Sequence, residues 1–239
     1  DDHYIPEGYA FQYYNQTYYS DAAARINLAS GETLSNINFP LAAGGIITGY
    51  VMDDSGQPLA NMSVGTSRIN DNWGRGYCTD ANGYYEMRAL PYGDYKASAS
   101  SSWNYCLQQP GIYVQQFYDH QPTWDAGAVL TLNSGAALLP NINFDLEIGG
   151  YISGHVEDDQ GNPVPNLRLA VIRAGENNWQ LAQDTDSNGN YVLGPLTADD
   201  YIVYACANCN GQMLVNEYYD DVYHQQDATA VSVTSSATT

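Results

Sequence analysis

The chain of 239 residues has very few basic residues. It contains 7 Lys and Arg residues against 27 Asp and Glu residues, which gives a formal net charge of −20 at pH 7, and Lys96 is its single lysine. A surface with this charge repels phosphate groups, so nucleic acid and anionic membrane surfaces are disfavoured as partners. We therefore expect no nucleic-acid partner.

Long apolar runs and helical periodicity are also missing. No apolar run approaches the roughly 20 residues that a membrane-spanning helix needs, so we expect no membrane insertion in this segment. Short alternating runs, bounded by Gly, Pro, Asn and Asp, dominate instead. This pattern is typical of an all-β protein.

A recurring catalytic set is the third absence. The histidines share no spacing typical of metal ligands, and no Ser–His–Asp combination repeats along the chain; they are His3, His120, His155 and His224. The sequence therefore predicts a protein that is not an enzyme and that needs no cofactor, apart from the calcium alternative considered below.

The chain repeats itself at domain length. Gly44–Pro58 returns as Gly149–Pro163, 105 residues later, and Asn36–Phe39 returns as Asn141–Phe144. A unit of this length is too long for one turn of a solenoid and long enough to close its own core. We expect residues 1–43 to be the C-terminal half of a preceding repeat, 44–148 a complete β-sandwich repeat, and 149–239 a second repeat that lacks its final strand.

Two repeated segments alternate apolar and polar residues. Ile37, Phe39 and Leu41 form one set, and Ile142, Phe144 and Leu146 form the other. Each segment predicts a strand with one buried face.

The turns between predicted strands carry their own signals. Asp80–Gly83 and Asp186–Gly189 each place Asn-Gly between two predicted strands, and this dipeptide favours a β-hairpin. About seven strands per unit with regularly spaced turns predict a β-sandwich.

Three motifs together resemble a known family. They are Gly49-x-Val51-x-Asp53-Asp54-x-Gly56-x-Pro58, then Thr79-Asp80-x-Asn82-Gly83-x-Tyr85, then Leu90–Tyr95. They resemble the carboxypeptidase regulatory-like domain, a transthyretin-like sandwich related to the collagen-adhesin B-type and serine-aspartate-repeat B-type modules of bacterial surface proteins. The resemblance implies an all-β fold of tandem seven-stranded transthyretin-like or Ig-like β-sandwich repeats of about 105 residues. It also implies stalk, spacer or accessory modules without catalytic residues.

The four cysteines favour disulfides over a metal or redox site. Cys206 and Cys209 form a Cys-x-x-Cys that follows a predicted strand, whereas a redox motif needs a helix N-terminus. A structural zinc site would need a second pair nearby. We expect a short Cys206–Cys209 loop and, by elimination, a Cys78–Cys106 bridge, as in an exported protein. The other two pairings stay open.

Asp184, Asp186 and Asn188 match the first half of a calcium-binding loop. The twelfth position of that loop is Pro195 instead of the bidentate Glu, and Cys78 stands where Asp184 would recur. Turn geometry alone explains the shared part of the motif. We therefore favour a turn, with calcium as the alternative.

An aromatic–acidic segment occurs three times, at residues 13–22, 117–126 and 218–228. Planar rings with a polar edge suit protein contacts or the stacking of sugars. The alternative is that these loops merely cap the sandwich. The candidate assembly or ligand contacts are Tyr18, Tyr19, His120, Trp124, Tyr223 and His224.

Together these patterns predict a structural segment of a long extracellular surface protein or fibre. We expect it to self-associate into a fibre or stalk by end-to-end or strand-complementing contacts, because an open sheet edge is a site for pairing. The alternatives are a carbohydrate-binding or adhesin module, with glycans as partners, and an accessory domain of a secreted hydrolase.

Overall fold

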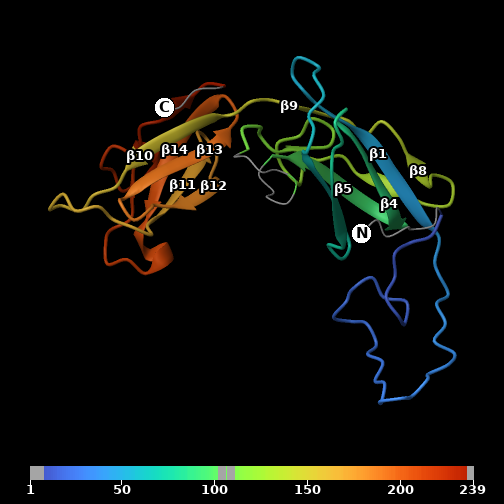
Figure 1. Ribbon diagram of the computed structural model, residues 1–239. Coiled ribbons are helices and arrows are strands. Elements are labelled where there is room, and N and C mark those ends of the chain that lie inside the picture. Colours follow the sequence, from blue (N-terminus) through green and yellow to red (C-terminus); the bar gives the residue numbers. More distant parts are fainter. Residues whose placement is uncertain (1–7, 102–105, 107–110, 236–239) are drawn as a thin grey trace. The chain divides into compact units, whose positions relative to one another are not determined.

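The structure is a computed structural model that describes residues 8–101, 106 and 111–235. These residues form sixteen strands and two short 3-10 helices, so the prediction of an all-β chain is confirmed. The chain divides into two compact units (Figure 1). Unit 1 comprises residues 1–111 and 115–146, and unit 2 comprises residues 112–114 and 147–239.

Unit 1 is built from two sheets. One has the order β4-β1-β8, with β9 also paired to β1, and the other has the order β3-β2-β5-β6, with β7 also paired to β5. The strands are β1 (Gly44–Asp53), β2 (Ser63–Arg68), β3 (Gly74–Cys78), β4 (Tyr84–Pro91), β5 (Gly93–Ser100), β6 (Gln116–Phe117), β7 (Leu130–Leu132), β8 (Leu138–Leu139) and β9 (Phe144–Leu146).

The core of unit 1 lies between these sheets because alternate residues of each strand face inward. Val51 on β1, Tyr85 on β4 and Phe144 on β9 are at most 1% exposed. Strand β9 runs parallel to β1, with Phe144 opposite Val51 and Leu146 opposite Asp53.

Unit 2 has a five-stranded sheet of the same order, β12-β11-β14-β15, with β16 also paired to β14. Its other sheet contains only β10 and β13 among the described residues. The elements are β10 (Gly150–His155), β11 (Arg168–Arg173), β12 (Trp179–Asp184), β13 (Asn190–Leu196), β14 (Asp199–Cys206), η1 (Ala207–Asn210), β15 (Glu217–Tyr218), η2 (Gln225–Asp227) and β16 (Val231–Val233).

A buried threonine ties the sheets together in the same way in both units. Thr79 Oγ1 donates to the carbonyl oxygen of Leu59 at 2.6 Å and accepts from the Met62 N–H at 2.9 Å. Thr185 Oγ1 does the same with Val164 and Leu167, at 2.6 and 2.9 Å. Each hydroxyl therefore satisfies two backbone groups in a loop that has no ladder to satisfy them.

The prediction of β-hairpins at Asp80–Gly83 and Asp186–Gly189 is wrong. Each turn links strands of different sheets, β3 to β4 in unit 1 and β12 to β13 in unit 2. Asp80 Oδ1 accepts the N–H groups of Asn82 and Tyr84, at 2.8 and 2.9 Å. The carboxylate thus fixes the tight turn locally, while the adjacent threonine directs the chain across the core.

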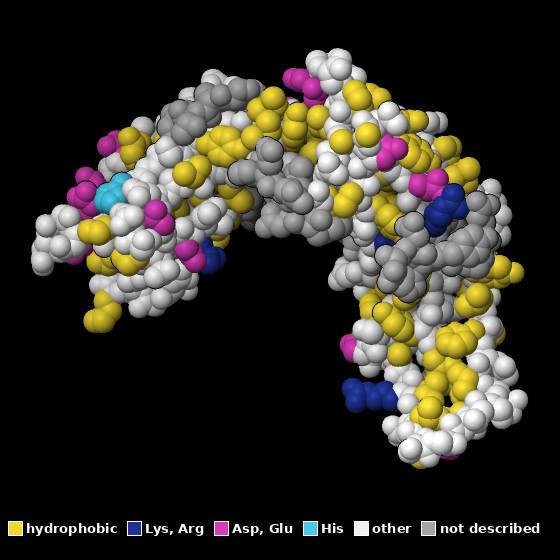
Figure 2. All heavy atoms as spheres, in the orientation of Figure 1, with side chains coloured by type: hydrophobic (Ala, Val, Ile, Leu, Met, Phe, Trp, Pro, Cys, Tyr) yellow, Lys and Arg dark blue, Asp and Glu magenta, His cyan; other side chains and the backbone are white. Residues whose placement is uncertain are grey.

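The strand predicted at Ile37–Leu41 is also wrong. Residues 8–43 carry no strand (blue in Figure 1), and Ile37, Phe39 and Leu41 are 36%, 51% and 45% exposed. Hydrophobic side chains accordingly show on the surface of this segment in Figure 2 (lower right). Apolar and polar residues alternate in this segment as they do in β9, but none of the described strands pairs with it.

The buried threonine yields a stability prediction. Thr185→Val keeps the shape of the side chain but leaves the Leu167 N–H and the Val164 carbonyl without their shared partner. We expect a loss of about 1–3 kcal/mol in the free energy of unfolding, measured by urea denaturation. Thr33→Val, at an exposed position, is the control and should change it little. An equal effect of both variants would contradict the assigned role.

Candidate assembly surface

The structure contains two disulfides, Cys78–Cys106 and Cys206–Cys209. They are the pairs favoured in the sequence analysis. Cys78–Cys106 ties the end of β3 to the loop that follows β5, and Cys206–Cys209 closes a short loop at the end of β14. A bridge such as the first stabilises a small domain by about 2–4 kcal/mol, mainly by restricting the unfolded chain.

The residues of the calcium alternative are engaged by protein groups. Arg168 forms an ion pair and hydrogen bonds with the carboxylate of Asp184. Asp186 Oδ1 accepts the N–H groups of Asn188 and Asn190, at 2.8 and 2.9 Å. In the described ranges no group of three or more His, Cys, Asp or Glu residues is placed to hold a metal ion. These hydrogen bonds are typical of a tight turn, and calcium binding at this loop stays a prediction.

Tyr18 and Tyr19 pack on the hairpin that joins β2 to β3. The guanidinium carbon of Arg68 lies 4.9 Å from the centre of the Tyr18 ring. Trp73 Nε1 donates to the Tyr18 carbonyl at 2.9 Å, and the Tyr19 hydroxyl donates to the Asp71 carbonyl at 2.7 Å. The aromatic–acidic segment at 13–22 thus forms a specific contact with residues far along the chain.

Trp124 and His120 have other surroundings in unit 1. The Lys96 ammonium donates to the carbonyls of Trp124 and Asp125, at 2.5 and 2.8 Å, and lies 5.6 Å from the Trp124 ring. His120 Nδ1 contacts Asp119 at 2.8 Å, and Nε2 contacts Asp145 at 3.2 Å. These two hydrogen bonds raise the pKa of His120. Both residues therefore stabilise the loop that contains them.

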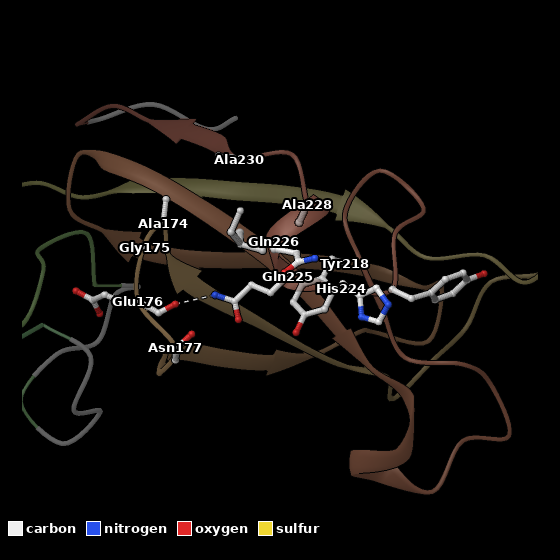
Figure 3. Close-up of a pocket in the computed structure, with 12 residues that line it drawn as sticks. Ala174, Gly175, Glu176, Asn177, Tyr218, His224, Gln225, Gln226, Ala228 and Ala230 are labelled. Carbon is white, nitrogen blue, oxygen red and sulfur yellow. Dashed lines mark hydrogen bonds between the residues drawn. The ribbon is translucent and has the colours of Figure 1, made fainter.

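Tyr223 and His224 line a pocket of about 800 Å³ in unit 2. Figure 3 shows His224 next to Tyr218, and Gln225 reaching toward Glu176, whose carbonyl accepts the Gln225 amide at 2.7 Å. Tyr223 itself is 63% exposed. The pocket is wide and mixes amides with aromatic rings, so it is compatible with a polar ligand.

The six candidate contacts therefore do not form one kind of site. Tyr18 and Tyr19 are used in a protein contact, His120 and Trp124 stabilise their own loop, and Tyr223 and His224 border an open pocket. The segment recurs in sequence, but its environment differs each time.

A second surface involves the closing strand of unit 1. Ile142, Phe144 and Leu146 are 5%, 0% and 0% exposed. The Ile142 N–H donates to the Thr48 carbonyl at 3.0 Å, and the Tyr85 hydroxyl donates to the Ile142 carbonyl. A Cβ atom at Gly49 would collide with that carbonyl oxygen, so only glycine allows this approach.

The corresponding place in unit 2 is a groove of about 380 Å³. Strand β1 extends to Asp53, where β9 pairs with it, whereas β10 ends at His155. No strand in the described part of unit 2 pairs with β10 on that side. The groove is lined by His155, Val156, Glu157, Leu169, Tyr191, Val203, Ala205, Glu217, Tyr218, Tyr219, Asp220 and Asp221.

The sequence analysis did not identify the residues that line this groove. By the repeat offset, Val156 corresponds to Val51, Gly154 to Gly49 and Tyr191 to Tyr85. Extending the repeat alignment to the residues that contact Asn141–Phe144 in unit 1 would have identified the residues of the groove.

Residues 46–116 match the family model of the carboxypeptidase regulatory-like domain. This match confirms the resemblance for that part of the chain. All three motifs that carry it, Gly49–Pro58, Thr79–Tyr85 and Leu90–Tyr95, lie inside the matched residues.

Among solved structures, the chain is similar to the Bacillus anthracis TIE protein, with 17% identity, a TM-score of 0.31, and coverage of 80% of this chain and 31% of that one. It is similar to the minor pilin of Streptococcus agalactiae, with 12% identity, a TM-score of 0.33, and coverage of 82% and 93%. For the major pilin subunit of Bacillus cereus the values are 7%, 0.26, 79% and 94%. TM-scores this low do not establish a shared fold.

A comparison with curated proteins found no match. None of the helices in the described ranges has the length and apolar character needed to cross a membrane.

The acidic turns predict a pH dependence. Hydrogen bonds from the Asn190 and Asn188 backbone lower the pKa of Asp186 below its ordinary value of 3.8. A lowered folded-state pKa gives stability that is present above the unfolded value and is lost as the pH falls through the folded one. We therefore expect Asp186→Asn to reduce the loss of stability below pH 3.8.

The measurement is the urea midpoint of both proteins between pH 7 and pH 2. Asp159→Asn, in a neighbouring exposed turn, is the control. Parallel acid profiles for Asp186→Asn and the unmodified chain would contradict the prediction.

Proposed function

We propose that the chain is a non-catalytic structural segment of a long extracellular surface protein or fibre, which assembles by contacts between successive repeats. The packing of Tyr18 and Tyr19 on the hairpin between β2 and β3 is the observation that carries this proposal. If residues 8–43 belong to a preceding repeat, as the offset predicts, this packing is a contact between one repeat and the next.

The contact has the composition of a protein interface. It combines a buried tryptophan, an arginine stacked on a tyrosine ring, and hydrogen bonds to backbone carbonyls. Trp73 is only 6% exposed. Arg68 Nε also donates to Asp71 Oδ1 at 2.9 Å, so its charge is compensated within the contact.

The recurring residues support a structural role for the repeats. Thr79 and Thr185 pin the loops that cross the core, and Asp53 and Asp158 accept backbone N–H groups within their turns. Each of these groups is used by the fold, and none is left as a repeated acid, base or nucleophile.

Two further features support an extracellular location. The two disulfides fit an oxidising environment. The surface chemistry also relies on carboxylates, amides and hydroxyls with a single lysine. The proposal includes strand-complementing contacts as a second kind of contact between repeats.

The test is imaging of the purified chain by electron microscopy over a range of concentrations. We expect filaments, and we expect Tyr18→Ala to shorten them and to shift the Trp73 fluorescence to the red. The same variant should lower the free energy of unfolding by about 1–2 kcal/mol, because it removes a cation–π contact and buried ring area.

Tyr50→Ala is the matched control, because Tyr50 is 38% exposed and packs on Tyr84 instead of Trp73. Single particles at every concentration would contradict the fibre function. Filaments that Tyr18→Ala leaves unchanged would contradict the role of this contact.

A second candidate function is carbohydrate binding at the pocket beside Tyr223. An exposed tyrosine can stack on a sugar ring, and Glu176, Asn177 and Gln225 offer hydrogen-bond partners around it. The chain would then act as an adhesin or as the accessory domain of a secreted hydrolase.

A panel of polysaccharides measured by pull-down and calorimetry tests the second candidate. Binding that Tyr223→Ala reduces by about tenfold or more, equivalent to about 1.4 kcal/mol, would support it. Tyr9→Ala, at another exposed tyrosine outside the pocket, should leave the affinity unchanged. If no polysaccharide binds, this candidate is excluded for the panel tested.

A further inference from the structure

The single lysine of the chain is buried in unit 1 beneath the loop that follows β6. Lys96, on β5, is 9% exposed. Its ammonium donates to the carbonyl oxygens of Trp124 and Asp125, at 2.5 and 2.8 Å, and lies 5.6 Å from the centre of the Trp124 ring. Two carbonyls and one aromatic face therefore form a site for an ammonium group inside unit 1.

The same strands form the corresponding sheet of unit 2. Strand β14 pairs with β11 and β15 as β5 pairs with β2 and β6. In this correspondence Ile202 takes the position of Lys96, and Tyr218 takes that of Phe117. An isoleucine has a shorter side chain without polar atoms, so it cannot donate to the loop as the lysine does.

The loop above this strand keeps its turn in both units. The Gly127 N–H donates to the Trp124 carbonyl, and the Ala228 N–H donates to the Gln225 carbonyl, at 3.2 Å in both cases. Gln225 and Gln226 thus stand where unit 1 has the two residues whose carbonyls accept the lysine ammonium. Unit 2 keeps the residues of the acceptor loop and lacks the donor.

The pocket of about 800 Å³ lies at this place in unit 2. Ile202 and Tyr218 line it from the sheet, and Gln225, Gln226 and Ala228 line it from the loop (Figure 3). A lysine side chain fills the corresponding place in unit 1. All of these elements are present in both units, so the difference comes from the side chains alone.

The charges around the pocket favour a cationic ligand. Among the described residues that line it there is no lysine or arginine; His224 is the one basic side chain and Glu176 the one acidic side chain. Arg173 Nη1 lies 3.8 Å from the Glu176 carboxylate, and Arg173 Nε lies 3.0 Å from that of Asp199, so one positive charge faces two negative ones. With a net charge of −20 on the whole chain, a cation is attracted and an anion is repelled.

The pocket is larger than an ammonium group alone requires. Its volume falls within the range of about 300–1,000 Å³ that is usual for small-molecule sites. Tyr218 offers an aromatic face, while Asn177, Gln226 and His224 offer polar groups around it. This lining suits a pyranose ring, which has an apolar face and hydroxyl groups at its edge.

We propose that the pocket of unit 2 binds a polysaccharide through an amino sugar that carries a free ammonium group. The ammonium takes the place of the Lys96 ammonium, at the loop of Gln225 and Gln226, and the sugar ring lies against Tyr218. This inference rests on carbohydrate binding, the second candidate function, for which it names the class of sugar. In unit 1 the lysine already fills the corresponding place, so we expect one site per chain.

Two variants fill the pocket as unit 1 fills it. Ile202→Lys supplies an ammonium from the chain itself, and Gln225→Trp supplies the indole that stands at this position in unit 1. Val192→Lys is the matched control for the first variant, because it adds the same charge at a position 51% exposed outside the lining. The pair separates loss of the site from a weaker general attraction between an acidic chain and a cationic ligand.

The experiment is isothermal titration calorimetry of the full chain with oligomers of glucosamine, of N-acetylglucosamine and of glucose, at one ionic strength. We expect the protonated glucosamine oligomers to bind about tenfold or more tightly than the other two, which carry no charge. Ile202→Lys and Gln225→Trp should abolish this binding, and Val192→Lys should change it by less than about twofold. Glu176→Gln should weaken it by about threefold to tenfold.

A peptide with one lysine is the fourth ligand, because its side chain carries the same ammonium group. Binding of this peptide without binding of the amino sugar overturns the choice of a sugar. Equal affinity for glucosamine and N-acetylglucosamine oligomers overturns the inference, and this comparison uses the unmodified chain, so it holds even if a variant fails to fold. Binding that both pocket variants leave unchanged also overturns it. Binding of the neutral oligomers alone overturns the inference and leaves carbohydrate binding standing; a chain that binds none of the four ligands contradicts both.

Discussion

The close parallel pairing of β9 with β1 is the interaction on which unit 1 depends. Without a side chain at Gly49, the Ile142 carbonyl reaches β1 and accepts the Tyr85 hydroxyl, and this places Phe144 in the core. Pairing of β9 with β1 and burial of Phe144 thus depend on the same approach. Where the pairing is absent, in unit 2, the first strand is shorter and a groove remains beside it.

The five-stranded sheets of the two units have the same order of strands. Thr79 and Thr185 fix the crossing between the sheets, and the acidic turns satisfy their own backbone N–H groups. These crossings and turns thus satisfy their backbone groups with side chains of their own unit.

The sequence predicted the class of fold from alternation and turn residues, and it predicted the strand β9 at Phe144–Leu146. It failed where the outcome depends on a distant partner. An Asn-Gly turn such as Asp80–Gly83 can join two strands of a hairpin or link two sheets. The hydrogen bonds of Thr79 to Leu59 and Met62, which lie far away in the sequence, distinguish the two cases. The exposed Phe39 and the buried Phe144 lie in identical tetrapeptides, so their burial cannot be read from local sequence. The recurrence of tyrosines similarly gave no sign that Tyr18 meets an arginine and a tryptophan.

Acidic side chains gather at the groove beside β10 in unit 2. An unpaired strand edge beside an apolar groove is a general risk for aggregation. Here Glu157, Glu217, Asp220 and Asp221 surround the groove, so acidic segments, which predominate in this chain, are repelled from it. Charge repulsion at this edge therefore disfavours pairing with acidic strands and so limits the risk of unspecific association.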